Sequence, residues 1–162
     1  MTPFIVARSI IAQLKTDTST GGLYEGNAWK FITGGMWHGA ATPAGSEPFP
    51  YAVFTVELSQ TIGMRDDGQN VTINIDLYDK TDNAFGNIEA AMLRIYGDAI
   101  SQANRTPTYG LHRLASLTPT TPNTFSSTLN GFICTAQSAS FADEKVVTGR
   151  MTFTARLQTN AA

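Results

Sequence analysis

Residues 70–85 read NVTINIDLYDKTDNAF, and this stretch decides the fold class. Its first part alternates apolar and polar side chains: Val71, Ile73, Ile75 and Leu77 against Thr72, Asn74, Asp76 and Tyr78. Because successive residues of a β-strand point to opposite faces of the sheet, the alternation predicts a strand over residues 70–79. One face of that strand is apolar and suited to a core, and the other is polar.

A helical pattern follows this strand after only a few polar residues. Its apolar residues recur at steps near 3.6, which predicts a helix over residues 83–103, and they are Phe85, Ile88, Met92, Ile95, Ala99 and Ile100. Thr81 or Asp82 is the expected N-cap, because a side-chain oxygen there can accept a backbone hydrogen bond. The stretch therefore predicts an amphipathic strand covered by an amphipathic helix.

The flanking segments extend the same pattern. Residues 3–15 predict a helix that begins at Thr2-Pro3. A strand over 51–62 and the strand over 70–79 predict a hairpin spanning residues 51–79, with its turn at Asp67-Gly68. A second hairpin is predicted over residues 132–159. Its last strand has an apolar face formed by Val147, Gly149, Met151, Phe153, Ala155 and Leu157.

Two long segments lack this periodicity. Residues 23–50 hold both tryptophans and many glycines and prolines, and a short strand is predicted within them around 29–32. A loop of that length is uncommon unless it has a function. Residues 118–128 are rich in Thr, Pro and Ser and predict a second loop, while residues 111–117 predict a short strand or an irregular edge.

The order of these elements indicates one α+β domain over residues 1–162. We expect a single antiparallel (mixed) β-sheet of about four or five strands, with two main helices packed on one face. Burying one large apolar side chain stabilises a fold by about 1.5–3 kcal/mol, so these faces can form a core without metal or disulfide.

Composition excludes several function classes. The net charge is −2, which is unlike a protein that neutralises nucleic-acid phosphates. No apolar run approaches the ~20 residues that span a bilayer, and Arg8 interrupts the apolar start, which is unlike a signal peptide. Cys134 is the only cysteine, so an internal disulfide or a thiolate metal cluster is impossible. We expect a protein made in the cytoplasm and without a membrane partner.

No catalytic, cofactor or metal site is predicted. His38 and His112 lie far apart, and turn or cap roles explain the acidic groups of residues 66–67, 76–82 and 143–144 better than acid–base chemistry. Cys134 lies mid-strand among apolar neighbours and is expected to be a buried structural cysteine. Five aromatic residues near the long loop could be local core or anchors in a partner's pocket: Trp29, Phe31, Trp37, Phe49 and Tyr51.

The order of motifs resembles the tail-completion, or tail-terminator, proteins of long-tailed bacteriophages. The resemblance rests on the leading helix, on PFPYAVFTV at residues 48–56, on residues 71–100 and on ASFADEKVVTGRMTFTAR at residues 139–156. It covers most of the chain. The insert between Ala28 and Pro48 and the loop at 118–128 depart from the family pattern.

The resemblance implies a structural protein of the virion tail or neck, assembled in the host cytoplasm, and not an enzyme. Such a protein forms a ring, commonly a hexamer, that caps the tail tube and docks the head-side connector, and DNA passes through its lumen without specific binding. Thr72, Asn74, Asp76 and Tyr78 would then face the lumen or a neighbouring subunit. No cofactor is implied.

Two other interpretations remain open. One is another neck or tail component, such as a head–tail joining protein or a tail-tube subunit. The other is a small α+β enzyme or ligand-binding domain with a pocket under residues 23–50 that uses His38 and Asp66 or Asp67.

Overall fold

The strand predicted at residues 70–79 forms the centre of the sheet. The computed structural model describes residues 3–38, 49–60, 68–98, 107–118, 126–143 and 146–160. Strand β3 (Gly68–Asp79) pairs antiparallel with β2 (Tyr51–Gln60), which confirms the predicted hairpin. The four apolar residues of β3 are completely buried, as the alternation predicts: Val71, Ile73, Ile75 and Leu77.

A second hairpin completes the central part of the sheet. It consists of β5 (Ser126–Asp143) and β6 (Val146–Asn160), and β6 also pairs antiparallel with β3. The predicted apolar face of β6 is buried from Val147 to Leu157. The predicted loop at 118–128 is too long, because β5 already begins at Ser126; residues 119–125 lie outside the described residues.

Two short strands extend the sheet to six, in the order β1-β2-β3-β6-β5-β4. Strand β1 (Met36–His38) runs parallel to β2, and β4 (Ser116–Leu117) runs antiparallel to β5. The sheet is therefore mixed, with more strands than the four or five expected. The strand predicted around 29–32 is wrong; the long loop instead contains β1 and a 3-10 turn, η1 (Glu25–Asn27).

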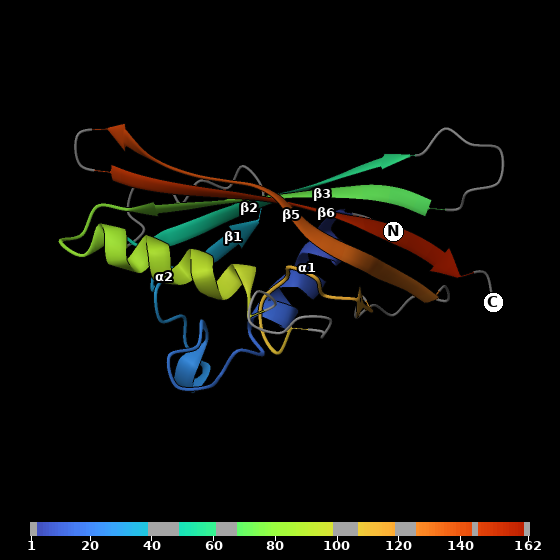
Figure 1. Cartoon of the computed structure of the whole chain (residues 1–162), viewed down its shortest axis with the longest axis horizontal. Helices are drawn as coiled ribbons and strands as arrows, with labels where there is room; N and C mark the ends of the chain where they lie inside the picture. The colour runs from blue at the N-terminus through green and yellow to red at the C-terminus, as the bar shows by residue number, and fades with distance from the viewer. Residues whose placement is uncertain are drawn as a thin grey trace.

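Both helices lie on one side of the sheet, which leaves the opposite side without a helix (Figure 1). Helix α1 (Pro3–Leu14) packs against β1 and β2, and α2 (Ala84–Tyr96) packs against β3 and β6. The predicted helix at 83–103 is too long within the described chain, because α2 ends where Gly97 adopts a φ of 106°. Residues 99–106 lie outside the described residues.

The buried faces of the two helices keep Ile88 and Ile95 of the predicted stripe, and the face of α2 otherwise includes smaller residues. On α2 they are formed by Ala84, Ile88, Ala91 and Ile95, and on α1 mainly by Val6, Ala7, Ile10 and Leu14. Phe85, which the predicted stripe places in the core, is 62% exposed, and Phe4 on α1 is 65% exposed. The predicted stripe residues 99–100 lie outside the described residues.

Small residues bring α2 close to the sheet. A Cβ on Gly149 of β6 would lie 2.7 Å from the Cγ2 atom of Ile88 and 2.7 Å from the Sδ atom of Met92. The helix therefore rests almost directly on the β6 backbone at this point. Within the described ranges, neither helix is long and apolar enough to cross a membrane.

The start of α2 is not capped as predicted. The N-cap position is Asn83, whose side chain makes no capping hydrogen bond, so the assignment of Thr81 or Asp82 is wrong. Asp79, fully buried at the end of β3, instead accepts hydrogen bonds from the Thr81 N–H at 2.8 Å and from the Asn87 Nδ2 atom at 2.8 Å. This carboxylate joins the strand to the helix, which is a structural role of the kind expected for the acids in this region.

Candidate functional site

The face of the sheet opposite the helices, here called the outer face, is a continuous polar surface. Paired strand residues project to the same side of a sheet, so the register of β2, β3, β6 and β5 collects their polar residues on this face. Its members include Thr55, Glu57, Thr72, Asn74, Asp76, Tyr78, Thr148, Arg150, Thr152, Thr154, Ser138 and Ser140. None of the described helices covers it.

The four predicted polar residues of β3 lie on the outer face, where β6 supplies their partners. The Oγ1 atom of Thr152 lies 2.9 Å from the Oδ1 atom of Asn74. The Nε atom of Arg150 donates to the Oδ1 atom of Asp76 at 2.6 Å. The sequence pattern does not identify Thr152 and Arg150 as site residues, since only the register between β3 and β6 places them beside β3.

Charge on the outer face is balanced by pairing. The hydrogen bond and the charge of Asp76 raise the pKa of Arg150 above its usual value, so this guanidinium stays a cation. Burial, together with the charge of Asp76, raises the pKa of Tyr78, so its phenol stays neutral at neutral pH. The face can therefore donate and accept hydrogen bonds without presenting a strong field of either sign.

Two shallow cavities open on the outer face. One, of about 300 Å³, is lined by Tyr78, Ser138, Ser140, Thr148 and Arg150. The other, of about 720 Å³, is lined mainly by polar residues, among them Asn70, Thr72, Asn130, Thr154 and Arg156. Among the residues that the structure describes, neither lining includes a histidine or a carboxylate.

The five predicted aromatic residues divide between two environments. Trp29 and Phe31 pack against the core, and Trp29 meets Tyr24 edge-on at 5.0 Å between ring centroids. The other three lie toward the outer face: Trp37, Phe49 and Tyr51. Trp37 is 38% exposed, and its Nε1–H donates to the Gly34 carbonyl at 3.1 Å.

Tyr51 connects this aromatic group to the predicted polar face. Its ring centroid lies 5.1 Å from that of Phe49 and 5.3 Å from that of Tyr78. The register of β1 on β2 places Trp37 opposite Val53, on the same face of the sheet. Three of the five candidate anchors thus adjoin the outer face, while Trp29 and Phe31 belong to the local core.

An apolar groove lies on the other side of the sheet, between α2 and the end of the β5–β6 hairpin. It has a volume of about 330 Å³, and its lining includes Phe85, Met92, Leu93, Gln137, Ala139 and Val147. Phe85 and Leu93 are each 62% exposed. The helical periodicity does not predict this groove, because it places Phe85 on the buried side of the helix.

His112 has a structural role. Its Nδ1 atom accepts a hydrogen bond from the backbone N–H of Cys134 at 3.0 Å, and its ring stacks on Tyr96 with 4.4 Å between centroids. Burial and the charge of Arg113 lower the pKa of His112, which favours the neutral ring that accepts this bond. The imidazole therefore joins the end of α2 to β5.

Cys134 is partly buried, not fully buried as expected, and burial raises the pKa of its thiol.

His38 ends β1, and Asp66 and Asp67 lie outside the described residues. Among the residues that the structure covers, no group of three or more His, Cys, Asp or Glu side chains could hold a metal ion.

The lowered pKa of His112 predicts a loss of stability in mild acid. The unfolded ring has its ordinary pKa of 6.5 and the folded ring a lower one, so the contribution to stability is complete above pH 6.5. It is lost as the pH falls below 6.5 toward the folded pKa. His112→Asn keeps an acceptor that does not titrate, and urea unfolding between pH 7 and 5.5 should then depend less on pH. A slope unchanged from that of the wild type would contradict this role of the His112 ring.

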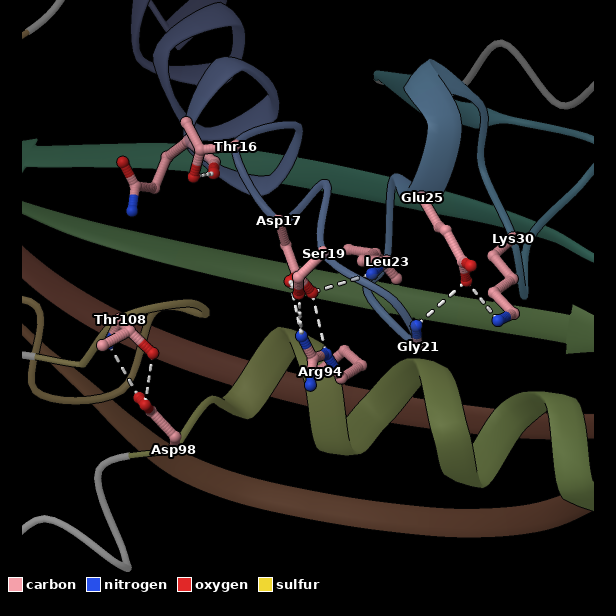
Figure 2. Close-up of polar contacts among 11 residues, drawn as sticks. Thr16, Asp17, Ser19, Gly21, Leu23, Glu25, Lys30, Arg94, Asp98 and Thr108 are labelled. Carbon is pink, nitrogen blue, oxygen red and sulfur yellow. Dashed lines mark hydrogen bonds and ion pairs between the residues drawn. The ribbon is translucent and has the colours of Figure 1, made fainter.

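An ion pair ties the loop after α1 to α2 (Figure 2). Arg94 donates through Nε to the Oδ2 atom of Asp17 at 2.8 Å, and the Leu23 N–H donates to the same oxygen at 2.7 Å. The Asp17 side chain is only 4% exposed, and the Arg94 guanidinium lies 3.5 Å from the ring centroid of Tyr109. This cluster holds the loop and the helix in place beneath the sheet.

Known protein families and curated protein sequences were compared with the chain, and none of them matches it.

Proposed function

We propose that this chain is a tail-terminator, or tail-completion, protein that forms a ring, most simply a hexamer, at the head-proximal end of a bacteriophage tail tube. The observation that carries the proposal is the outer face: a whole side of a six-stranded sheet that no described helix covers and that is polar without being strongly charged. Its partners in this function are copies of itself, the tail-tube protein and the head-side connector.

The charge of the outer face suits a channel through which DNA passes. A protein that neutralises phosphates with Lys and Arg binds DNA tightly, and this would slow the passage of DNA through the ring. On β2, β3 and β6 the acidic Glu57 and Asp76 balance the basic Arg150 and Arg156. Hydroxyl and amide groups make up most of the remainder, so the face interacts with water more than with phosphate.

The proposal is tested by imaging the purified protein in negative stain and by measuring its mass in sedimentation. Single closed rings would support a terminator. Open stacks that lengthen with concentration would favour a tail-tube subunit. A protein that stays monomeric up to its solubility limit would contradict the proposal.

Trp37 provides a sharper test of the same proposal. Its ring is 38% exposed and packs beside Gly35, away from the buried core, so Trp37→Ala should change the free energy of unfolding by less than about 1 kcal/mol. If Trp37 is an anchor between subunits, the variant should remain a folded monomer that forms no rings.

Trp29→Ala is the matched control for this experiment. Trp29 packs against the core, so its removal should lower the unfolding midpoint instead of acting on assembly alone. Loss of folding in the Trp37 variant, or normal rings formed by it, would contradict the anchor role of Trp37.

A further inference from the structure

Among the described residues, the strands at both edges of the sheet are paired over only part of their length. Strand β4 pairs with β5 only at Leu129 and Asn130, and His112 occupies the Cys134 N–H, so residues 135–143 have no strand beside them among the described residues on the side away from β6. Strand β1 pairs with β2 only over residues 52–54. Residues 55–60 of β2 therefore also have no strand beside them, among the described residues, on the side away from β3. We call these stretches the β5 edge and the β2 edge.

The middle of each edge carries little of the usual protection against pairing. Natural proteins block exposed edges with charged residues, prolines or bulges, because unpaired backbone groups recruit other strands. Residues 135–142 of the β5 edge contain no charged residue and no proline, Asp143 ends that edge, and the β2 edge contains one charge, Glu57. The register of β5 on β6 is irregular between Cys134 and Ala136 and again between Phe141 and Asp143, and it is regular between these points.

The two edges have compatible directions. Each of the pairs β2–β3, β3–β6 and β6–β5 is antiparallel, so β5 runs opposite to β2. When a second copy is generated by rotation about an axis roughly parallel to the strands, its β2 runs in the same direction as the β2 of the first copy. The β5 edge of one copy and the β2 edge of the next therefore meet as an antiparallel pair, the commoner kind of strand pairing.

The faces of the two edges are also compatible. On the helix side, the half-buried Leu58 of the β2 edge would arrive beside Ala139, next to the apolar groove lined by Met92 and Leu93. On the outer side, Thr55, Glu57 and Ser59 would lie beside Ser138 and Ser140. Apolar groups thus meet apolar groups and polar groups meet hydroxyls, because a rotation does not exchange the two faces.

We propose that a second copy of this chain adds its β2 edge to the β5 edge, and that Leu58 of the added copy covers the groove beside Leu93. This inference rests on the proposed function and names the surfaces that join the ring. The contact is head-to-tail, using two different patches of each subunit, and such contacts close into rings when the rotation allows.

The positions of the two edges predict a tilted arrangement. The β5 edge lies at the end of the sheet where β5 turns into β6, and the β2 edge lies at the opposite end (Figure 1). Joining them staggers neighbouring copies along the strand direction. Such stagger tilts strands against the axis of a closed barrel, so the ring would carry inclined strands with the outer face toward its lumen.

Cross-linking tests the contact directly. In a Cys134→Ser background, Ser59→Cys and Ser138→Cys place one exposed thiol near each edge. A short bis-maleimide should convert the double variant into a ladder of covalent oligomers on a denaturing gel. Each single variant should stay mainly monomeric, because a head-to-tail contact never brings two copies of one edge together.

The outcomes separate this inference from the proposed function. The double variant could form rings in negative stain without a stronger cross-linking ladder than the single variants. This result would contradict the proposed contact between the β5 edge and the β2 edge but not the ring function. Covalent dimers of the Ser138→Cys single variant would also overturn the contact, since they indicate pairing of two β5 edges. Absence of any assembly would contradict the ring function itself.

A charge in the groove gives a second test. Leu93→Lys places an ammonium where Leu58 of the next copy should pack, and the concentration needed for half-assembly should rise at least tenfold. Ala12→Lys, at an exposed position of α1, is the control and should assemble as the wild type does. An equal effect of the two substitutions would overturn the role of the groove.

Discussion

Gly110→Ala is expected to lower the free energy of unfolding by about 3–4 kcal/mol. Gly110 has a φ of 85°, a conformation that costs other residues about 1–2 kcal/mol. A Cβ at this position would also lie 2.6 Å from the Gly97 nitrogen and 2.7 Å from the Tyr96 carbonyl oxygen. Because both atoms belong to the backbone, the clash requires α2 and the segment before β4 to move apart.

Gly21→Ala is the matched control for this prediction. Gly21 has a similar φ of 80°, but nothing lies within 4 Å of the place where its Cβ would be. Its substitution should therefore cost only the backbone strain, about 1–2 kcal/mol. Urea unfolding followed by circular dichroism measures both variants. Equal losses would show that the close approach of Gly97 and Gly110 contributes nothing to stability.

Arg94→Met is expected to lower the free energy of unfolding by about 3 kcal/mol at pH 7. Removing one partner of a buried ion pair leaves the other charge without compensation, which typically costs about 3–5 kcal/mol. Asp17 has a 4% exposed side chain and would keep only the weaker hydrogen bonds from Leu23 and Ser19. The lower end of the range applies because Arg94 is 19% exposed.

Arg150→Met provides a control with the same chemistry at the surface. Arg150 also contacts both oxygens of an aspartate, Asp76, but its side chain is 61% exposed. Exposed pairs contribute about 0–1 kcal/mol, so this variant should unfold nearly as the wild type does. A loss as large as that of Arg94→Met would contradict the role assigned to burial.

The pH dependence of the Arg94 variant gives a further check. Burial raises the pKa of Asp17, and the hydrogen bonds from Arg94 and Leu23 more than offset this, so the folded pKa lies below the ordinary 3.8. The stability gained from the carboxylate is therefore complete above pH 3.8 and is lost as the pH falls through the folded pKa. The difference between wild type and Arg94→Met should narrow from pH 6 to pH 3. A constant difference would exclude the charge of Asp17 as its cause.

Patterns within single elements were enough to predict most of the framework. The alternation in β3 correctly identified the residues that face the core, and the same holds for β6. These predictions succeeded because the direction of a strand side chain depends only on its position along that strand. For the same reason, the polar residues of β3 were correctly placed together on one face.

The helices show where local patterns stop being sufficient. Of the stripe predicted for α2, Ile88 is buried and Met92 packs against the core, whereas Phe85 is exposed and the small residues Ala84 and Ala91 are buried in its place. Small residues occupy the contact because α2 comes close to Gly149 of β6 and leaves no room for a large side chain. Helix periodicity indicates that a buried face exists, whereas the shape of the surface beneath the helix decides which residues form it.

The partners of the candidate site depended on the tertiary structure. Asp76 and Arg150 are 74 residues apart, Asn74 and Thr152 are 78 apart, and Asp17 and Arg94 are 77 apart. The open edges and the parallel strand β1 likewise appear only when the sheet is assembled. The sequence alone determined which residues alternate, which segments are helical and that charge is sparse, because these depend on neighbours along the chain. Only the tertiary structure decided which strands lie side by side and which edges stay open, because pairing depends on contacts between distant segments.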